Sequence, residues 1–215
     1  MDISLTERLK TISSMIRGRV CADIGTDHAL LPCYLILSGK ASKCYACDIA
    51  KGPLERAKAN IEKYGLEEKI ETVLYNGISP EIAANCDSIV IAGMGGNMIA
   101  DILSVHKFKD IRLVLQPMTK QEVLREYLIS NGFVIEDERT VFDNGKYYTV
   151  MQVGLGVSEK YSPAKLEVGK QPLLRLDETD RMYIKNKVEA LKKRLNNKET
   201  KSYVEEALKE LEEVL

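Results

Sequence analysis

The feature that most constrains the fold is a regular alternation of strand-like and helix-like segments between Arg19 and Gln116. The expected strands are short, apolar and rich in β-branched residues, which is typical of strands buried on both faces of a parallel sheet. They cover residues 20–24, 44–48, 70–75, 88–92 and 111–116. Helices are expected between and after them, at 29–38, 52–64, 81–84, 96–106 and 120–131. This alternation predicts a doubly wound α/β sheet.

The pattern changes near the middle of the chain. Residues 133–142 and 146–153 flank Asp143-Asn144-Gly145, a turn sequence typical of a β-hairpin. Nicotinamide-binding Rossmann domains usually continue with further parallel units instead. At the other end, residues 4–16 are expected to form a helix, with Ser4 and Glu7 at capping-box spacing.

The C-terminal part lacks strand signals. Residues 154–170 hold three glycines and a proline and are expected to form a linker or an irregular excursion. Apolar residues then recur in steps of 4, 3 and 4 at positions 184–195 and again at 204–215, a heptad stripe on each of two helices. Asn196-Asn197 between them predicts a turn and an antiparallel coiled-coil hairpin. One long helix pairing with another chain stays open as an alternative. The expected domains are therefore residues 1–153 and 154–215.

Composition excludes several classes of protein. The 45% apolar and 29% charged residues are ordinary for a globular chain. No apolar run approaches the roughly 18 residues of a membrane span, and the charged N-terminus does not resemble a secretory signal, so a cytoplasmic location is expected. Cys44 and Cys47 form a C-x-x-C pair. Because they lie on an expected strand, three positions apart, they should point to opposite faces, and we expect buried, reduced thiols and no metal site.

Ligand-type residues follow the first expected strand. Asp23 and Gly25 form a turn that lets the backbone pass close to a ligand, and the next helix offers open N–H groups. A dinucleotide fingerprint needs three glycines, whereas Thr26 and Asp27 follow Gly25 here. A carboxylate at Asp27 disfavours a pyrophosphate and favours a cationic ligand. S-adenosylmethionine, which carries an ammonium and a sulfonium, fits this requirement.

Similar residues follow the second and third strands. Asp48 ends the second strand, about 25 residues after the first turn, where an acid can bind both hydroxyls of a ribose. Asn76 and Gly77 end the third strand, and a side-chain amide there can bind the edge of an adenine. The carboxyl ends of parallel strands share one edge of the sheet, so these residues should lie near the first turn.

The last two expected parallel strands carry the same signal. The fourth ends in Ala92-Gly93-Met94-Gly95-Gly96, and three glycines in four residues indicate close approach or unusual dihedral angles. The fifth runs into Gln116-Pro117-Met118, where the Gln116 amide offers a donor and an acceptor for a base edge. Ordinary turns explain each feature singly, but not their coincidence at one edge.

The segments ADIGTDHALLP, AGMGG and LVLQPM resemble the bacterial tRNA (adenine-N1)-methyltransferases that modify the adenine at tRNA position 22. The resemblance implies a class I methyltransferase fold with seven strands, S-adenosylmethionine as donor, and a C-terminal coiled-coil domain that contacts tRNA. It places donor contacts at Asp23, Gly25, Thr26, Asp48, Asn76, Gly77 and Gly93, with Ile49, Ala92 and Met94 beside them. It places the acceptor adenine near Asp27, His28, Gln116 and Pro117. Members often have Asn where Met118 stands, and Glu where Asp48 stands.

The expected chemistry centres on positioning. Adenine N1 carries a lone pair at neutral pH, so methyl transfer needs in-line geometry more than proton abstraction. We expect Asp27 to accept a hydrogen bond from the exocyclic amine and stabilise the developing charge; binding the donor's ammonium is the alternative. His28 is expected beside the base, or alternatively at a helix cap. Tyr147 and Tyr148 pack in the hairpin core or stack on a base extruded from the tRNA.

The net charge of −1 conceals a strong local asymmetry. Residues 181–201 hold eight Lys or Arg against two acids, whereas residues 202–215 hold one Lys against five Glu. Phosphate contacts depend on local charge, so near-neutrality does not exclude RNA. The predicted phosphate-contacting residues are Lys185, Lys192, Lys193, Arg194 and Lys198. A solvated helix face is the alternative explanation.

Two other functions stay open at this level. A methyltransferase of a different substrate shares the donor motifs but does not need the helical hairpin. A non-catalytic module would use the hairpin as an interaction arm and the glycine turns as structure. A monomer or weak dimer is expected in each case.

Overall fold

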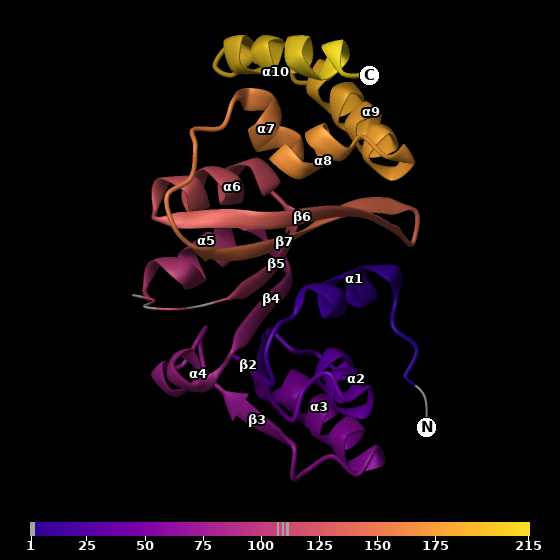
Figure 1. The fold of residues 1–215 in the computed structure, drawn as a ribbon, viewed down its shortest axis with the longest axis vertical. Helices are drawn as coiled ribbons and strands as arrows, with labels where there is room; N and C mark the ends of the chain where they lie inside the picture. Colours follow the sequence, from indigo (N-terminus) through magenta and orange to yellow (C-terminus); the bar gives the residue numbers. More distant parts are fainter. Residues whose placement is uncertain (1–2, 107, 109, 111) are drawn as a thin grey trace.

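The computed structural model describes residues 3–106, 108, 110 and 112–215. Its centre is a seven-stranded sheet in the order β3-β2-β1-β4-β5-β7-β6 (Figure 1). The first five strands are parallel, and β7 pairs antiparallel with β5 and β6. The strands are β1 (Val20–Ile24), β2 (Lys43–Asp48), β3 (Ile70–Leu74), β4 (Ser88–Gly95), β5 (Leu113–Thr119), β6 (Phe133–Asp143) and β7 (Lys146–Leu155). The predicted doubly wound sheet with a final antiparallel hairpin is confirmed.

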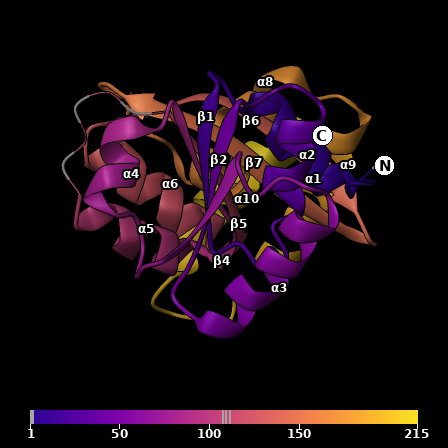
Figure 2. The same ribbon diagram turned by 90° about the horizontal axis from the view of Figure 1, so that it is seen from below.

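Helices cover both faces of this sheet (Figure 2). One face carries α1 (Glu7–Met15), α2 (Leu30–Leu37) and α3 (Lys51–Lys63), and the other carries α4 (Pro80–Asn85), α5 (Gly96–Ser104) and α6 (Gln121–Ser130). Each expected helix of the alternating region is present, with ends that differ by a few residues. The expected fifth strand began at Ile111, which lies outside the described residues. Its observed end reaches Thr119, so Gln116, Pro117 and Met118 belong to the strand itself.

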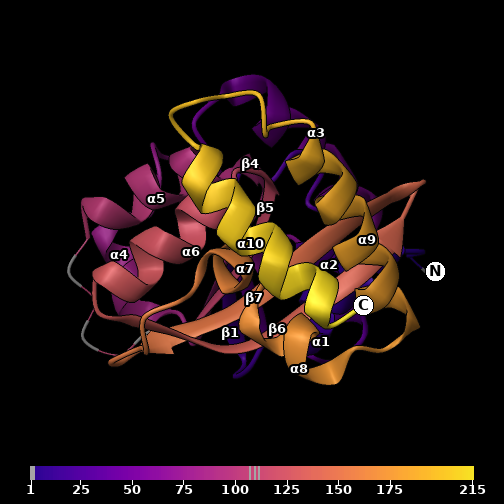
Figure 3. The same ribbon diagram turned by 90° about the horizontal axis from the view of Figure 1, so that it is seen from above.

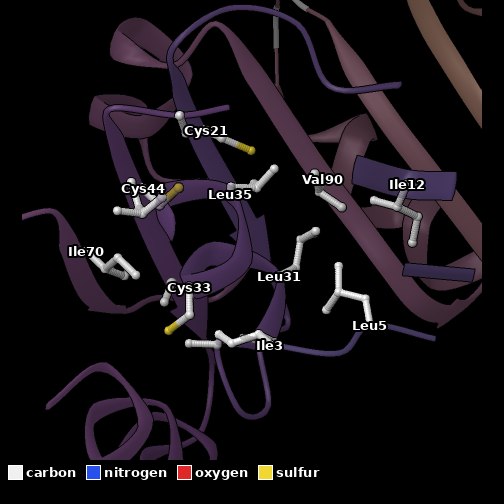
Figure 4. Close-up of a cluster of buried hydrophobic side chains, with 14 of the residues drawn as sticks. Ile3, Leu5, Ile12, Cys21, Leu31, Cys33, Leu35, Cys44, Ile70 and Val90 are labelled. Carbon is white, nitrogen blue, oxygen red and sulfur yellow. The ribbon is translucent and has the colours of Figure 1, made fainter. Parts of the chain in front are cut away.

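Two apolar cores lie on the two faces of the sheet. The core beneath α1 and α2 contains Ile12, Leu35 and Cys44 (Figure 4), whereas Cys47 belongs to the core beneath α5 and α6. The C-x-x-C pair therefore points to opposite faces, as the strand geometry predicted. Burial raises the pKa of the Cys44 thiol to about 12, so this thiol stays protonated.

Two local expectations are wrong. The first helix is capped by Thr6, whose side chain accepts a hydrogen bond from the Leu9 N–H, so Ser4 and Glu7 form no capping box. The expected linker contains structure: β7 continues to Leu155, and α7 (Pro163–Val168) and the start of α8 (Lys170–Arg175) lie inside it. Ser162 caps α7 and Pro163 occupies its first turn, a favourable helix start that outweighs the neighbouring glycines.

The C-terminal helices α9 (Glu178–Lys192) and α10 (Lys201–Glu213) run in roughly opposite directions above the sheet (Figure 3). Their stripes are buried at Ile184, Leu191, Val204 and Leu211, in a third core that also includes residues of α7. The loop between α9 and α10 contains Asn196-Asn197, so the single long helix is excluded. Because α10 contacts α7 as well as α9, the α9–α10 helical hairpin packs onto the rest of the chain.

A buried ion pair joins this C-terminal part to the sheet. Arg125 on α6 and Glu138 on β6 have fully buried side chains, with 2.6 Å between Nη2 and Oε1. Arg125 also donates to the Leu166 carbonyl of α7, and Arg175 of α8 donates to the Glu138 carbonyl at 3.3 Å. None of the helices in the described ranges has the length and apolar character that a membrane span needs.

Candidate active site

A cavity of about 280 Å³ opens at the carboxyl ends of β1 and β4. Its lining residues come from α1, the β1–α2 turn and the end of β4: Arg8, Leu9, Asp23, Gly25, Thr26, Asp27, His28, Ala29, Leu30, Leu31, Ala92 and Gly93. A second cavity, lined by Arg17, Asp87 and Arg112, lies at the amino ends of the strands. Ligands of doubly wound sheets bind at the carboxyl ends, so the first cavity is the candidate site.

Glycine backbones shape this cavity. Gly25 has φ +80°, and a Cβ there would lie 2.2 Å from Cε of Met94. The N–H groups of Gly25 and Thr26 donate to the Cys47 carbonyl at 2.8 and 2.9 Å, which anchors the turn to β2. Gly93 also has φ +80°, and a Cβ built there meets no described atom within 4 Å. Gly25 and Gly93 therefore allow a backbone conformation with positive φ, and Gly93 also leaves open space for a ligand.

Asp23 is the acid at the base of the cavity. Burial raises its pKa from 3.8 to about 6, against the opposing effects of the Thr26 hydroxyl and the Arg8 guanidinium. The Thr26 hydroxyl is itself buried and has no hydrogen-bond partner of ordinary geometry among the described residues. A half-buried carboxylate beside a buried hydroxyl fits a ligand that brings a positive charge and a hydrogen-bonding group.

The neighbouring strand ends extend the same edge. Asp48 Oδ1 accepts a hydrogen bond from Ala50 N at 2.8 Å at the start of α3, and the Tyr75 N–H donates to the Asp48 carbonyl at 3.0 Å. Asn76 and Gly77 follow directly, with φ +82° at Gly77. The structure thus places Asp48, Ile49, Asn76 and Gly77 at the predicted edge, although they lie outside the cavity lining.

Asp27 and His28 lie at the mouth of the cavity and are held from α3. Arg56 binds Asp27 Oδ1 through two of its nitrogens, and His28 Nε2 lies 3.3 Å from Asp27 Oδ2. Asn60 donates to the His28 carbonyl at 2.9 Å. The sequence analysis missed Arg56 and Asn60, because nothing along the chain indicates which face of α3 meets this turn. Asp27 therefore has one oxygen engaged by Arg56, with the second directed to His28.

The Gln116 amide, which was expected to face a base, is bonded within the protein in this structure. Gln116 is fully buried, and its Oε1 accepts from Arg8 Nη1 at 2.6 Å and from Gly93 N at 3.2 Å. Its Nε2 donates to the Pro117 carbonyl at 3.0 Å. Pro117 is buried as well, and Met118 is 39% exposed. The amide is used to fix Arg8, a cavity residue that the sequence analysis missed because it lies 108 positions away.

The predicted phosphate contacts divide into two groups. Lys192 pairs with Glu212 at 3.0 Å, and Arg194 pairs at 2.8 Å with the buried Glu167. Lys185, Lys193 and Lys198 are exposed and form no ion pair within residues 3–106, 108, 110 and 112–215. In the same ranges no cluster of His, Cys, Asp or Glu is arranged to hold a metal ion.

Comparison with known proteins identifies the family. A model described as "Methyltransferase domain" matches residues 5–151. The chain is 40% identical to the tRNA (adenine(22)-N(1))-methyltransferase of Bacillus subtilis over 159 residues, which cover 72% of this chain and 67% of that protein. The chain belongs to the tRNA (adenine-N1)-methyltransferase family.

Solved structures of this family share the whole fold. The crystal structure of the B. subtilis m1A22 tRNA methyltransferase superposes with a TM-score of 0.83 at 29% identity, covering 99% of both chains. A Streptococcus pneumoniae protein, described as a candidate tRNA (m1A22) methyltransferase in complex with S-adenosyl-L-methionine, gives 0.84 at 29% identity, covering 99% of this chain and 100% of that one. The similarity includes the C-terminal helices, which the family model does not reach.

Proposed function

We propose that this chain transfers a methyl group from S-adenosylmethionine to N1 of the adenine at position 22 of tRNA. The observation that carries the proposal is the cavity at the carboxyl ends of β1 and β4, in a chain of this methyltransferase family. Its S. pneumoniae relative is described in complex with the same donor. The division into a donor-binding domain at residues 1–153 and a tRNA-contacting part at 154–215 belongs to the proposal, as does a cytoplasmic monomer or weak dimer.

The residues around the cavity suit this donor. Asp23 supplies a half-buried carboxylate, Thr26 supplies a buried hydroxyl, and Gly93 leaves space beside them. Asp48 at the end of β2 is the acid for the ribose hydroxyls, and Asn76, on the next strand end, is the amide for the adenine edge. When bound, S-adenosylmethionine supplies an electrophilic methyl group on a sulfonium.

Asp27 and His28 are proposed to meet the acceptor base at the mouth of the cavity. The lone pair of N1 forms the new N–C bond while the methyl–sulfur bond breaks and sulfur keeps its electron pair. The base becomes positively charged, and Asp27 stabilises it by accepting a hydrogen bond from the exocyclic amine. Arg56 fixes the carboxylate in place, and Arg8, held by Gln116, also lines the cavity.

Nucleoside analysis tests this function. Total tRNA from cells lacking the modification is incubated with the chain and S-adenosylmethionine, then digested and analysed by mass spectrometry. We expect 1-methyladenosine, with primer extension stopping at position 22. Methyl incorporation into another nucleoside, or none into any tRNA, would overturn the proposal. Methylation of a small molecule or protein instead would favour a methyltransferase of a different substrate.

A further inference from the structure

A further pocket, here called the Tyr147 pocket, lies between the turn of the β6–β7 hairpin and helix α9, outside the donor cavity. Its volume is about 330 Å³, and its lining residues are Gly145, Lys146, Tyr147, Tyr183, Asn186 and Lys187. Two aromatic rings, two lysines and one amide side chain thus converge from two elements that are distant in sequence. The combination is typical of sites that bind single-stranded nucleic acid.

The aromatic side chains form a continuous row. The rings of Phe142 and Tyr147 are 4.8 Å apart between centroids, and those of Tyr147 and Tyr183 are 6.4 Å apart. Phe142 is 51% exposed, whereas Tyr183 is 3% exposed and closes the buried side of the pocket. Tyr147 lies between them, half-buried and supported by both neighbours. A ring held in this way loses little entropy when a base stacks on it.

The charge around the pocket favours a phosphate. Lys146 is exposed and forms no ion pair in the described part of the chain, although Asp143 stands opposite it in the strand register. Lys187 Nζ lies 3.7 Å from Glu167, which also binds Arg194 at 2.8 Å. One carboxylate therefore faces two cations and leaves one positive charge uncompensated. The pocket can thus bind a base on its rings and a phosphate on its lysines.

The pocket shares the edge of the sheet that carries the candidate active site. In the antiparallel β5–β7 pair, Leu115 is opposite Met151, and Tyr147 lies four residues before Met151, in the direction of the carboxyl end of β5. Lys187 donates to Gln121 Oε1, at the start of α6, with a distance of 3.1 Å.

The hairpin separates this pocket from the donor cavity. Tyr147 and Tyr148 are adjacent on a strand, so their side chains point to opposite faces. The Tyr148 ring lies 5.8 Å from the guanidinium of Arg8, which lines the donor cavity, while Tyr147 lines the Tyr147 pocket. The donor cavity and the Tyr147 pocket therefore lie on opposite faces of the β6–β7 hairpin. An RNA strand with one base in the active site would have this aromatic pocket on the other side of the hairpin.

We propose that the Tyr147 pocket, defined by its six lining residues, binds a second unstacked nucleotide of the tRNA. Its base stacks on Tyr147 and its phosphate contacts Lys146 and Lys187. This inference rests on the proposed function, because it assumes that the substrate is a tRNA with a base extruded from its fold. The inference gives the β6–β7 hairpin a role in binding the tRNA, in addition to the basic stretch at residues 181–201.

Binding measurements on full-length variants test the pocket. The variants are Lys146→Ala and Tyr147→Leu, and the control is Lys69→Ala, an exposed lysine just before β3 at the opposite edge of the sheet. The dissociation constant for unmodified tRNA is measured by filter binding over a range of salt concentrations. We expect Tyr147→Leu to weaken binding about tenfold. Lys146→Ala should lower the slope of log affinity against log salt by about one.

Two further measurements separate the possible failures. Calorimetric affinity for S-adenosylmethionine should be unchanged in both variants, which excludes a general loss of folding. Wild-type-like tRNA affinity and salt slope in both variants would overturn the pocket, even if the chain methylates tRNA. A wild-type chain that binds tRNA without forming 1-methyladenosine would instead overturn the proposed function, and a chain that binds no tRNA would overturn both.

Discussion

At the scale of single residues, the ionisation of Asp23 affects donor binding and stability in opposite directions. Burial favours the neutral form of this carboxyl and raises its pKa to about 6, whereas a positively charged donor favours the charged form. The folded pKa exceeds the usual 3.8, so the contribution of this group to stability is complete below about pH 4. That contribution is lost as pH rises through 6.

Asp23→Asn should therefore stabilise the donor-free chain at pH 8 while abolishing donor binding. A pKa difference of about two corresponds to at most about 3 kcal/mol, so a gain of about 1 to 3 kcal/mol in the free energy of unfolding is expected. Urea unfolding at pH 8 and pH 4 measures it, and the gain should shrink at pH 4, where the wild-type carboxyl is protonated. A variant that binds S-adenosylmethionine normally would contradict the role of Asp23.

Asp27→Asn should lower turnover about 100-fold with little change in stability. The amide keeps the shape of the side chain but removes the charge that faces the methylated base. The pair with Arg56 is exposed, so its loss should cost at most about 1 kcal/mol. Single-turnover methylation and thermal unfolding measure the two effects, with Arg56→Gln as the comparison. Wild-type turnover in Asp27→Asn would remove this residue from the mechanism.

At the scale of elements, the glycines after β4 have different tasks. Gly93 faces open space at the donor cavity, whereas a Cβ on Gly96 would lie 2.1 Å from the Lys120 carbonyl oxygen. Gly96 thus lets the first turn of α5 approach the backbone that links β5 to α6. Within the cluster of three glycines, Gly93 leaves space for a ligand, whereas Gly96 is required by the packing of α5.

Gly96→Ala should destabilise the chain by about 2 to 4 kcal/mol, because the clash involves backbone and cannot be relieved by a rotamer. Gly52→Ala provides the matched control. Gly52 lies in the first turn of α3, where the nearest atom to a new Cβ is 3.9 Å away on flexible Arg56. That change should stabilise by about 0.5 to 1 kcal/mol. Equal unfolding midpoints for the two variants would show that Gly96 is not required by packing.

At the scale of the whole molecule, the Arg125–Glu138 pair connects the sheet to the C-terminal helices. Arg125 contacts the backbone of α7, and Arg175 of α8 contacts both Glu138 and the buried Asp180 of α9. A Cβ at Gly169 would collide with Glu138 Oε2, so the backbone between α7 and α8 passes directly over the carboxylate. The network therefore fixes where the C-terminal helices stand relative to the site.

Glu138→Ala should cost about 3 to 5 kcal/mol, because it leaves the buried Arg125 charge without its partner. Hydrogen exchange should show lost protection in α7, α8 and α9 before the sheet is affected. The double variant Arg125→Leu with Glu138→Leu should recover most of that stability, since both charges are removed. A single variant as stable as the wild type would mean that water reaches Arg125 and compensates its charge.

The sequence by itself determined the local and periodic features. Short apolar strands separated by helices specified the sheet, and the Asp143-Asn144-Gly145 turn specified its hairpin. The positions of Asp23, Asp48 and Asn76 at one edge followed, because parallel strands connected by helices bring their carboxyl ends together. The family resemblance indicated methyl transfer to an adenine of tRNA as the reaction, and the comparisons confirmed the family.

Only the tertiary structure decided which residues from distant elements meet. Arg8 reaches Gln116 across 108 positions, and Arg56 reaches Asp27 from the next helix. Nothing in the sequence marks Gln116 as buried, because a glutamine is as suited to a base edge as to an internal bond. The Tyr147 pocket likewise forms only in the folded chain, where residues of the β6–β7 hairpin meet residues of α9. Side-chain contacts of this kind depend on how helices pack on the sheet, and packing is set by the whole chain rather than by any local pattern.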